Sequence, residues 1–185
     1  MITIKLEKDE VTPHLRRLLK EAETNSPLSR VLGRAASNEL KKHFRERNKT
    51  GNKKGWKRSN FWTAVGASVQ SPVSSPGKIV IPITDVRLPL KVFGGTVRPT
   101  KGSKNLAIPI HPSVAGVLAR QIFDTLGFAM TRAGVQLLIR KTDGTPLYVL
   151  KKSTTHKPDP NALPKDAKVA DAMTKAGDIY LRNRR

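Results

Sequence analysis

Basic and aromatic residues gather in one stretch of the sequence. Nine Lys and Arg residues and a single acid, Glu46, lie between Lys41 and Arg58, and Trp56 and Phe61 are interleaved with them or follow directly. Because cations neutralise phosphates and aromatic rings stack on bases, this pattern is typical of a nucleic-acid-binding segment. The alternative is a solvated loop that Trp56 anchors to the body of the protein. Both interpretations stay open at this point.

A second stretch combines glycine with lysine and raises the question of a phosphate-binding loop. It is KVFGGTVRPTKGSK, residues 91–104, and the apolar run Leu106–Ile110 follows it. A P-loop requires Gly-x-x-x-x-Gly-Lys-Ser/Thr. Here the spacing from Gly95 to Gly102 is too long, and Lys104 does not directly follow the second glycine. The stretch therefore predicts a turn between two strands better than a nucleotide site.

The residue types used in catalysis and metal binding show no such grouping. Each of the four histidines lacks a second His, Asp or Glu at metal-ligand spacing; they are His14, His43, His111 and His156. The chain has no Cys, which excludes disulfides, thiolate nucleophiles and Cys-ligated metals. We therefore expect no catalytic residues, no metal and no cofactor. An enzyme such as a metal-dependent nuclease is the least favoured class.

The composition is strongly basic. The 185 residues carry a formal net charge of +21, and 37% of them are hydrophobic, which suffices for one modest core. Such an excess of positive charge favours either nucleic acid or acidic neighbouring subunits as partners. The N-terminus MITIKLEKDE has no apolar core of a signal peptide, so we expect none. We also expect no membrane span, because no apolar run is long enough.

The first half of the chain has the pattern of helices. Ile2, Ile4 and Leu6 alternate with polar residues, as in a short strand, and Thr12-Pro13 has the form of a helix start. A long helix should run from Pro27 to about Arg47, since apolar residues recur there at three and four positions. Residues 48–60 should form an exposed loop, and Phe61–Val69 a helix or a strand.

The second half has the pattern of strands. Asp143-Gly144 predicts a hairpin between strands Val135–Arg140 and Leu147–Leu150. The other expectations are a strand over 79–84 with Pro82 at an edge or bulge, an extended stretch over 86–93, a turn or close backbone approach at Gly94-Gly95, a strand over 106–110 and a short helix from Pro112.

Beyond Leu150 the composition changes. The segment KKSTTHKPDPNALPKD has three prolines and no evident core residues, which predicts an extended arm. Val169, Met173, Ala176 and Tyr180 then trace a terminal amphipathic helix. The predicted class is α+β, with long N-terminal helices packed on a small, mostly antiparallel sheet, an extended C-terminal arm and a terminal helix. The predicted domains are a core over 1–150, with the basic loop 48–60, and the arm and helix over 151–185.

Three stretches taken together resemble a known family. They are FRERNKTGNKKGWKRS, KVFGGTVRPTKGSKNLAIPI and GVQLLIRKTDGTPLYVLKKS. The chain is similar in them to the bacteriophage virion-morphogenesis family, the tail-completion or neck proteins of Mu-like and related tailed phages. The most specific part is a GG-T-[IV]-x-P-x-K turn followed by LA-I-P. The residues that match it are Gly94, Gly95, Thr96, Val97, Arg98, Pro99, Lys101, Leu106, Ala107, Ile108 and Pro109.

The resemblance implies a role without catalysis. Proteins of this kind form a ring between the portal side of the capsid and the tail, which implies a virion location in the neck or tail after synthesis in the host bacterial cytoplasm. We expect a homo-oligomer, a hexamer first and a dodecamer second. The implied partners are other neck, portal-adaptor and tail-tube or terminator proteins. DNA in the lumen of the ring is a further expected contact, and no membrane is expected.

The exposed basic residues are the expected contacts of such a subunit. In the first loop they are Arg45, Arg47, Lys49, Lys53, Lys54, Trp56, Lys57 and Arg58. In the second they are Arg98, Lys101 and Lys104, held by a turn at Gly94, Gly95 and Pro99. The alternative function is a nucleic-acid-binding protein that uses residues 41–58 on phosphates.

Overall fold

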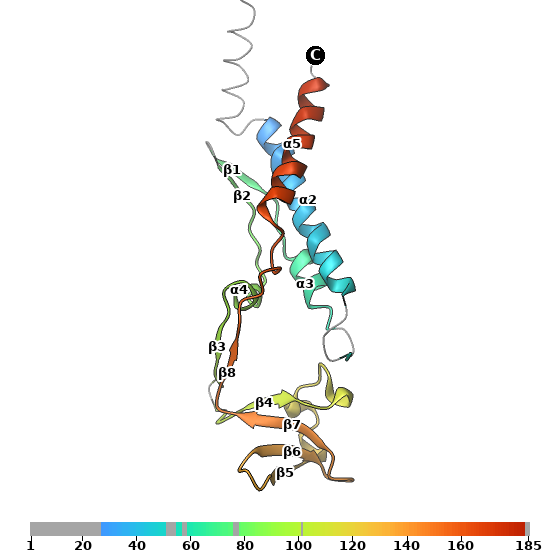
Figure 1. Cartoon of the computed structure of the whole chain (residues 1–185), viewed down its shortest axis with the longest axis vertical. Coiled ribbons are helices and arrows are strands. Elements are labelled where there is room, and N and C mark those ends of the chain that lie inside the picture. Colours follow the sequence, from blue (N-terminus) through green and yellow to red (C-terminus); the bar gives the residue numbers. More distant parts are fainter. Residues whose placement is uncertain (1–26, 51–54, 57–58, 76–77, 101, 184–185) are drawn as a thin grey trace, which may run out of the picture. The chain divides into compact units, whose positions relative to one another are not determined.

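The computed structural model describes residues 27–50, 55–56, 59–75, 78–100 and 102–183, and it confirms the α+β class (Figure 1). The strand and helix expected before Pro27 lie outside the described residues. The chain divides into two compact units. Of the described residues, those within 27–45, 64–85 and 163–183 form the first unit, and those within 46–63 and 86–162 form the second. The domain boundary expected after residue 150 stays a prediction.

Two long helices dominate the first unit. Helix α2 runs over Pro27–Lys49 and α5 over Asp166–Arg182, close to the bounds that the apolar periodicity predicts. Arg47 and Lys49 lie in the last turn of α2, where cations favour the negative end of the helix dipole. Figure 1 shows α5 beside α2. A Cβ on the buried Gly177 of α5 would lie 3.4 Å from Leu32 Cδ2 of α2, so the two helices pack closely there.

A two-stranded ribbon packs against α2 in the same unit. Strands β1 (Val73–Ser75) and β2 (Lys78–Val80) pair antiparallel. The strand predicted over 79–84 is therefore too long: after Val80 it continues only as an isolated bridge between Ile83 and Val69. Pro82 lies in this gap and has no N–H for a sheet ladder, which explains the interruption. The ambiguous segment 61–69 forms helix α3 (Phe61–Ala67) and then this bridge.

The second unit contains a four-stranded antiparallel sheet in the order β4-β7-β6-β5. Its strands are β4 (Leu106–Pro109), β5 (Leu126–Met130), β6 (Gln136–Arg140) and β7 (Pro146–Lys151). The predicted hairpin joins β6 to β7, and Gly144 adopts a φ of +71° in its turn. Strand β5 was missed by the sequence analysis.

A small apolar core covers one face of this sheet. Its buried residues are Val114, Leu126, Leu147 and Tyr148. Three short 3-10 helices contribute to it: η1 (Pro112–Val114), η2 (Ala119–Gln121) and η3 (Phe123–Thr125). The Tyr148 hydroxyl donates a 3.0 Å hydrogen bond to the Val117 carbonyl, and burial raises the pKa of this phenol.

Residues 86–93 are helical at their end, so the extended conformation predicted for them is wrong. Helix α4 spans Leu88–Phe93, with Pro89 in its first turn, where a missing N–H costs no hydrogen bond. The segment had been expected to continue the preceding strand in an extended conformation. In the structure Leu88 is buried, while Phe93 is 77% exposed. The helical conformation thus places Leu88 in the core.

The segment after Leu150 is less independent than an extended arm. Strand β8 (Thr154–His156) pairs antiparallel with β3 (Gly95–Val97) and forms a second ribbon. Ala162 is 1% exposed, which corrects the expectation that the arm carries no core residues. The composition misled because a small alanine gives no apolar pattern. None of the described helices has the length and apolar character needed to cross a membrane.

Candidate functional site

The C-terminal end of α2 is held by an ion pair and an aromatic ring. The Arg47 guanidinium pairs with the Asp159 carboxylate, and its Cζ lies 4.7 Å from the centroid of the Trp62 ring. Arg47 and Asp159 are both partly buried, with 26% and 29% of their side chains exposed. A cation over an aromatic face contributes about 0.5–1 kcal/mol at an exposed site and more when water is excluded. Arg47 thus uses its charge within the chain.

Phe61 extends the same arrangement to α4. Its ring packs edge-to-face on Trp62, with centroids 4.8 Å apart. Arg87 Cζ and Lys91 Nζ lie 5.1 and 5.9 Å from the Phe61 centroid. We call these residues together the cation–aromatic cluster; its members are Arg47, Phe61, Trp62, Arg87, Lys91 and Asp159. It joins four segments of the second unit that are distant in sequence.

The cation–aromatic cluster uses aromatic rings that could otherwise stack on nucleic-acid bases. The aromatic residues near the basic stretch would need a free face to stack on bases. Phe61 instead has two cations of its own chain against it, and Trp62 has Arg47. Trp56 is partly buried, and its role as an anchor stays a prediction. In the described residues this end of the basic segment is therefore organised as a structural joint.

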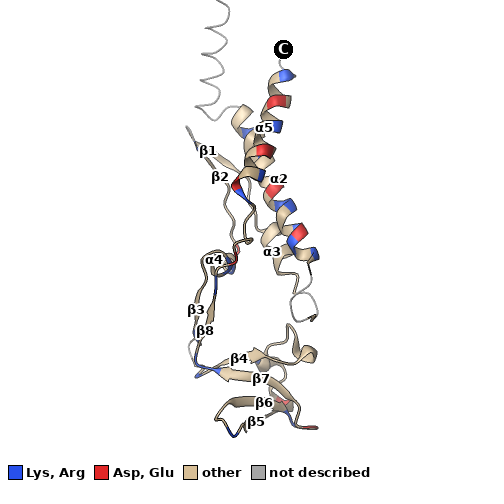
Figure 2. Ribbon diagram, in the orientation of Figure 1, with Lys and Arg blue, Asp and Glu red and all other residues tan. Residues whose placement is uncertain are grey.

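The remaining residues of the first predicted contact set have different surroundings. Arg45 and Lys49 are exposed, and Arg45 Nε donates a hydrogen bond to the Lys41 carbonyl, at 3.3 Å. Figure 2 shows basic residues recurring along α2 as far as this end. Four of the predicted contacts lie outside the described residues: Lys53, Lys54, Lys57 and Arg58.

The second basic loop connects β3 to β4. Arg98 and Lys104 are exposed, Pro99 is partly buried, and Lys101 lies outside the described residues. The two glycines lie before this loop, where α4 ends and β3 begins, and they have positive φ values of 69° for Gly94 and 140° for Gly95. A Cβ on Gly94 would lie 2.6 Å from the His156 carbonyl oxygen. At Gly94 the backbone of β8 therefore lies too close to leave room for a side chain.

The four-stranded sheet has a second apolar face. The register pairs Ile108 with Val149 and Val149 with Leu137, and Ile139 follows Leu137 on the same side. Tyr148 and Leu126 point to the other side, toward the core. All four residues of the second face remain partly exposed, whereas Tyr148 is 1% exposed. We call Ile108, Leu137, Ile139 and Val149 the open sheet face.

Further apolar side chains are exposed at the edge strand β5. Phe128 and Met130 alternate with Gly127 and Ala129, and they are 60% and 59% exposed. β5 has a strand partner on one side only among the described residues, as has β4 at the other end of the sheet. An exposed edge with large apolar side chains is a surface on which another chain can pair or pack.

The described residues hold no group of three or more His, Asp or Glu side chains arranged as metal ligands. Two shifted pKa values have structural causes. The Thr145 N–H donates to the Asp143 carboxylate at 3.0 Å and lowers the pKa of that carboxyl, with Arg140 adding to the effect. Burial raises the pKa of Tyr148. Asp143 belongs to a hairpin turn and Tyr148 to the core.

No protein-family model, curated protein or solved structure matches this chain. The likeness to the virion-morphogenesis family therefore rests on the residues quoted for it.

The sequence did not predict three features of these sites, namely Asp159, Trp62 and strand β5. Asp159 showed no signal as the partner of Arg47, because 112 positions separate the two. Trp62 was passed over although it stands next to Phe61. The apolar residues of β5 lacked flanking turn signals, yet the alternation of Phe128 and Met130 with small residues was a usable strand signal.

Proposed function

We propose that this chain is a non-catalytic structural subunit of a tailed-phage neck. It completes the tail and joins head to tail as a homo-oligomeric ring between the portal-side connector and the tail. The family resemblance supplies the biological setting. The observation that supports a role in assembly is the open sheet face, an apolar surface on a unit whose own core has only a few buried side chains.

The energetics favour covering that face. Fully burying a Val, Leu or Ile side chain stabilises by about 1.5–3 kcal/mol relative to leaving it exposed, and these four are partly exposed. The two-stranded ribbon β3–β8 adds a further weak element, since an isolated two-stranded ribbon is marginally stable in water. Contacts with neighbouring copies would stabilise both.

A ring follows if the open sheet face docks on a different surface of the next copy. Such a head-to-tail contact repeats until the rotation closes. We propose a hexamer, with a dodecamer as the alternative. The exposed Arg45, Lys49, Arg98 and Lys104 would then meet acidic surfaces of the portal adaptor or tail proteins, or DNA in the lumen.

Leu137→Glu tests the assembly interface. A carboxylate in the open sheet face should disrupt subunit contacts, because burying an unpaired charge is strongly unfavourable. In sedimentation experiments we expect the unsubstituted chain as a ring and the variant as a monomer with unchanged β-sheet circular dichroism. Val135→Glu is the matched control: it adds the same charge at an exposed residue just before β6 and should leave the ring intact.

Leu137→Thr replaces the large apolar side chain by a smaller, polar one that is still compatible with a strand, so it should weaken the ring without a new charge. If both Leu137 variants assemble as the unsubstituted chain does, the open sheet face is not the interface. For the role itself, virions made without the protein should give full heads beside separate, finished tails. Joined particles would overturn the neck assignment. The alternative, phosphate binding by residues 41–58, stays a prediction that salt titrations can test.

A further inference from the structure

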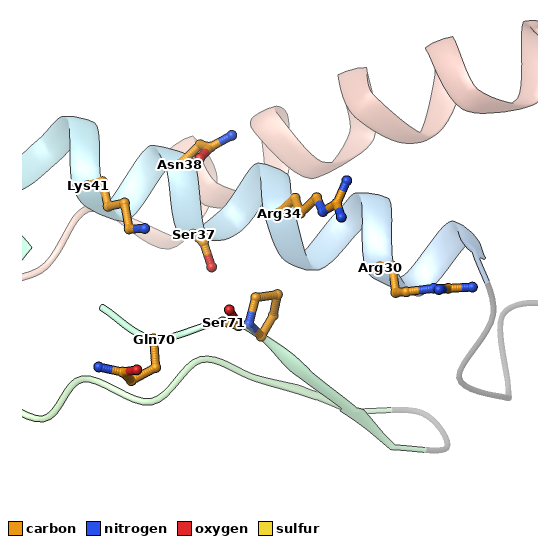
Figure 3. A pocket seen from close by; sticks show the side chains of 8 residues that line it. Arg30, Arg34, Ser37, Asn38, Lys41, Gln70 and Ser71 are labelled. Atoms are coloured by element: carbon orange, nitrogen blue, oxygen red, sulfur yellow. The ribbon is translucent and has the colours of Figure 1, made fainter. Parts of the chain in front are cut away.

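A pocket in the first unit carries an inference that does not depend on the virion role. It lies between α2 and the segment that leads into β1, with a volume of about 330 Å³ (Figure 3). We call it the α2 pocket. The residues that line it are Arg30, Arg34, Ser37, Asn38, Lys41, Gln70, Ser71 and Pro72.

The spacing of the sequence explains one wall of the pocket. Positions 30, 34, 37 and 41 are separated by three or four residues, so they share one face of the helix. At 1.5 Å per residue the stripe from Arg30 to Lys41 is about 16 Å long. Gly33 explains the opposite wall: a Cβ there would lie 2.8 Å from Pro72 Cβ, so only glycine lets the Pro72 segment approach α2 so closely.

The charge of the pocket is uncompensated. Arg30, Arg34 and Lys41 line it, and no carboxylate does. Among the described residues none of these three side chains has an ion pair. Arg30 and Arg34 stand four positions apart on one helix, where like charges repel. A cluster with this cost and no carboxylate in the lining is suited to an anion from outside the chain.

Ser37 supplies a second, independent observation. It is 5% exposed, and within the described part of the chain its hydroxyl has no hydrogen-bond partner. In Figure 3 the Ser37 side chain points from α2 toward the Gln70–Ser71 segment, into the pocket. Buried hydroxyls nearly always have a partner, and leaving one without is costly. An oxygen-rich ligand in the pocket would provide that partner.

We propose that the α2 pocket binds a phosphate group, and specifically a phosphodiester of the DNA backbone. Guanidinium groups present paired N–H donors that match two oxygens of a phosphate, and Lys41 adds a point charge. Ser37 and Asn38 complete the set with neutral hydrogen-bonding groups. The stripe of cations along α2 gives the site an extended form, which suits a polymer of phosphates.

Arg30→Gln with Arg34→Gln is the decisive variant. Lys168→Gln with Lys175→Gln is the matched control, because it removes the same charge from exposed positions of helix α5 in the same unit, outside the pocket. Two ligands are titrated: inorganic phosphate, followed by amide shifts of α2 in NMR spectra, and a 20-base-pair DNA duplex, followed by fluorescence anisotropy at several salt concentrations. Circular dichroism verifies that each variant is folded.

We expect the pocket variant to bind both ligands about tenfold more weakly or worse, and the control to stay within about threefold. The log–log salt slope for DNA should fall by about 1.8 in magnitude if two phosphate contacts are lost, at about 0.9 each. Ser37→Ala, which keeps every charge, should weaken inorganic phosphate by about threefold to tenfold through the lost hydrogen bond.

Two results would overturn the proposal in different ways. If the pocket variant and the control lose DNA affinity equally, the binding reflects overall charge and the pocket is not a site. If the pocket variant loses inorganic phosphate but its DNA affinity and salt slope are unchanged, the site takes free phosphate, which refutes the DNA assignment. Because these titrations use the purified chain, their failure leaves the proposed neck role standing, and failure of the ring experiment leaves the pocket standing.

Discussion

Gly94 illustrates how a single position constrains the second unit. It combines a φ of +69° with a predicted Cβ position 2.6 Å from the His156 carbonyl oxygen. An L-residue is strained in this backbone region, and here a side chain would also meet the backbone next to β8. Gly116 has a similar φ of +81°, but nothing lies within 4 Å of its Cβ position. A substitution at Gly116 therefore reports backbone strain alone, whereas one at Gly94 reports strain together with a steric clash.

We expect Gly94→Ala to lower the free energy of unfolding by about 2–4 kcal/mol, the sum of strain and displacement of the β3–β8 ribbon. Gly116→Ala should cost about 1–2 kcal/mol from strain alone. Urea unfolding monitored by circular dichroism measures both. Equal losses in the two variants would show that the ribbon shifts freely to admit a methyl group.

At the scale of elements, two buried helical glycines differ in the space that is available beside them. Gly33 of α2 lies against Pro72, and Gly177 of α5 lies against Leu32. Both lose the same helix propensity relative to alanine, about 1 kcal/mol. They differ in the room beside them: a Cβ at Gly33 would be 2.8 Å from a ring carbon, while at Gly177 it would make ordinary contact at 3.4 Å.

Gly177→Ala should therefore stabilise the first unit by up to about 1 kcal/mol, because the gain in propensity meets no clash. Gly33→Ala should destabilise it by about 1–3 kcal/mol, because the β1–β2 ribbon must move off α2. Thermal unfolding of the two variants gives the comparison. Stabilisation by Gly33→Ala would mean that the Pro72 segment is not held against the helix.

At the scale of the whole molecule, the net charge of +21 must be accommodated. The ion pairs Arg47–Asp159 and Arg140–Asp143 are two of the contacts that offset it. The chain has 35 Lys and Arg residues against 14 Asp and Glu residues, so pairing within the chain cannot neutralise most of the cations, and mutual repulsion lowers stability. Salt shortens the screening length from about 30 Å at 0.01 M to about 8 Å at 0.15 M.

Raising NaCl from about 10 to 150 mM should increase the unfolding temperature by about 2–4 °C, which corresponds to roughly 1 kcal/mol for a chain of this size. Sodium phosphate at equal ionic strength should increase it further if the α2 pocket is occupied. Differential scanning calorimetry distinguishes the two salts. An unfolding temperature that does not change with NaCl would mean that repulsion between the cations is not a significant cost.

Local signals in the sequence were sufficient where the structure is local. The periodicity of residues 27–49 determined a helix, Asp143-Gly144 determined a hairpin, and Gly94-Gly95 marked a close backbone approach. These depend on nearest neighbours and on backbone conformation. The extended conformation expected for residues 86–93 was wrong, because Leu88–Phe93 form helix α4 with Leu88 buried.

The sequence alone determined the α+β class, the long basic helix and the excess of positive charge. Only the tertiary structure decided which cations are engaged within the chain and which remain available. Arg47 meets Asp159 across 112 positions, while Arg30, Arg34 and Lys41 line a pocket formed by Pro72 against Gly33. The physical reason is that an ion pair or a pocket depends on distances in space, which folding sets between residues that no sequence spacing connects.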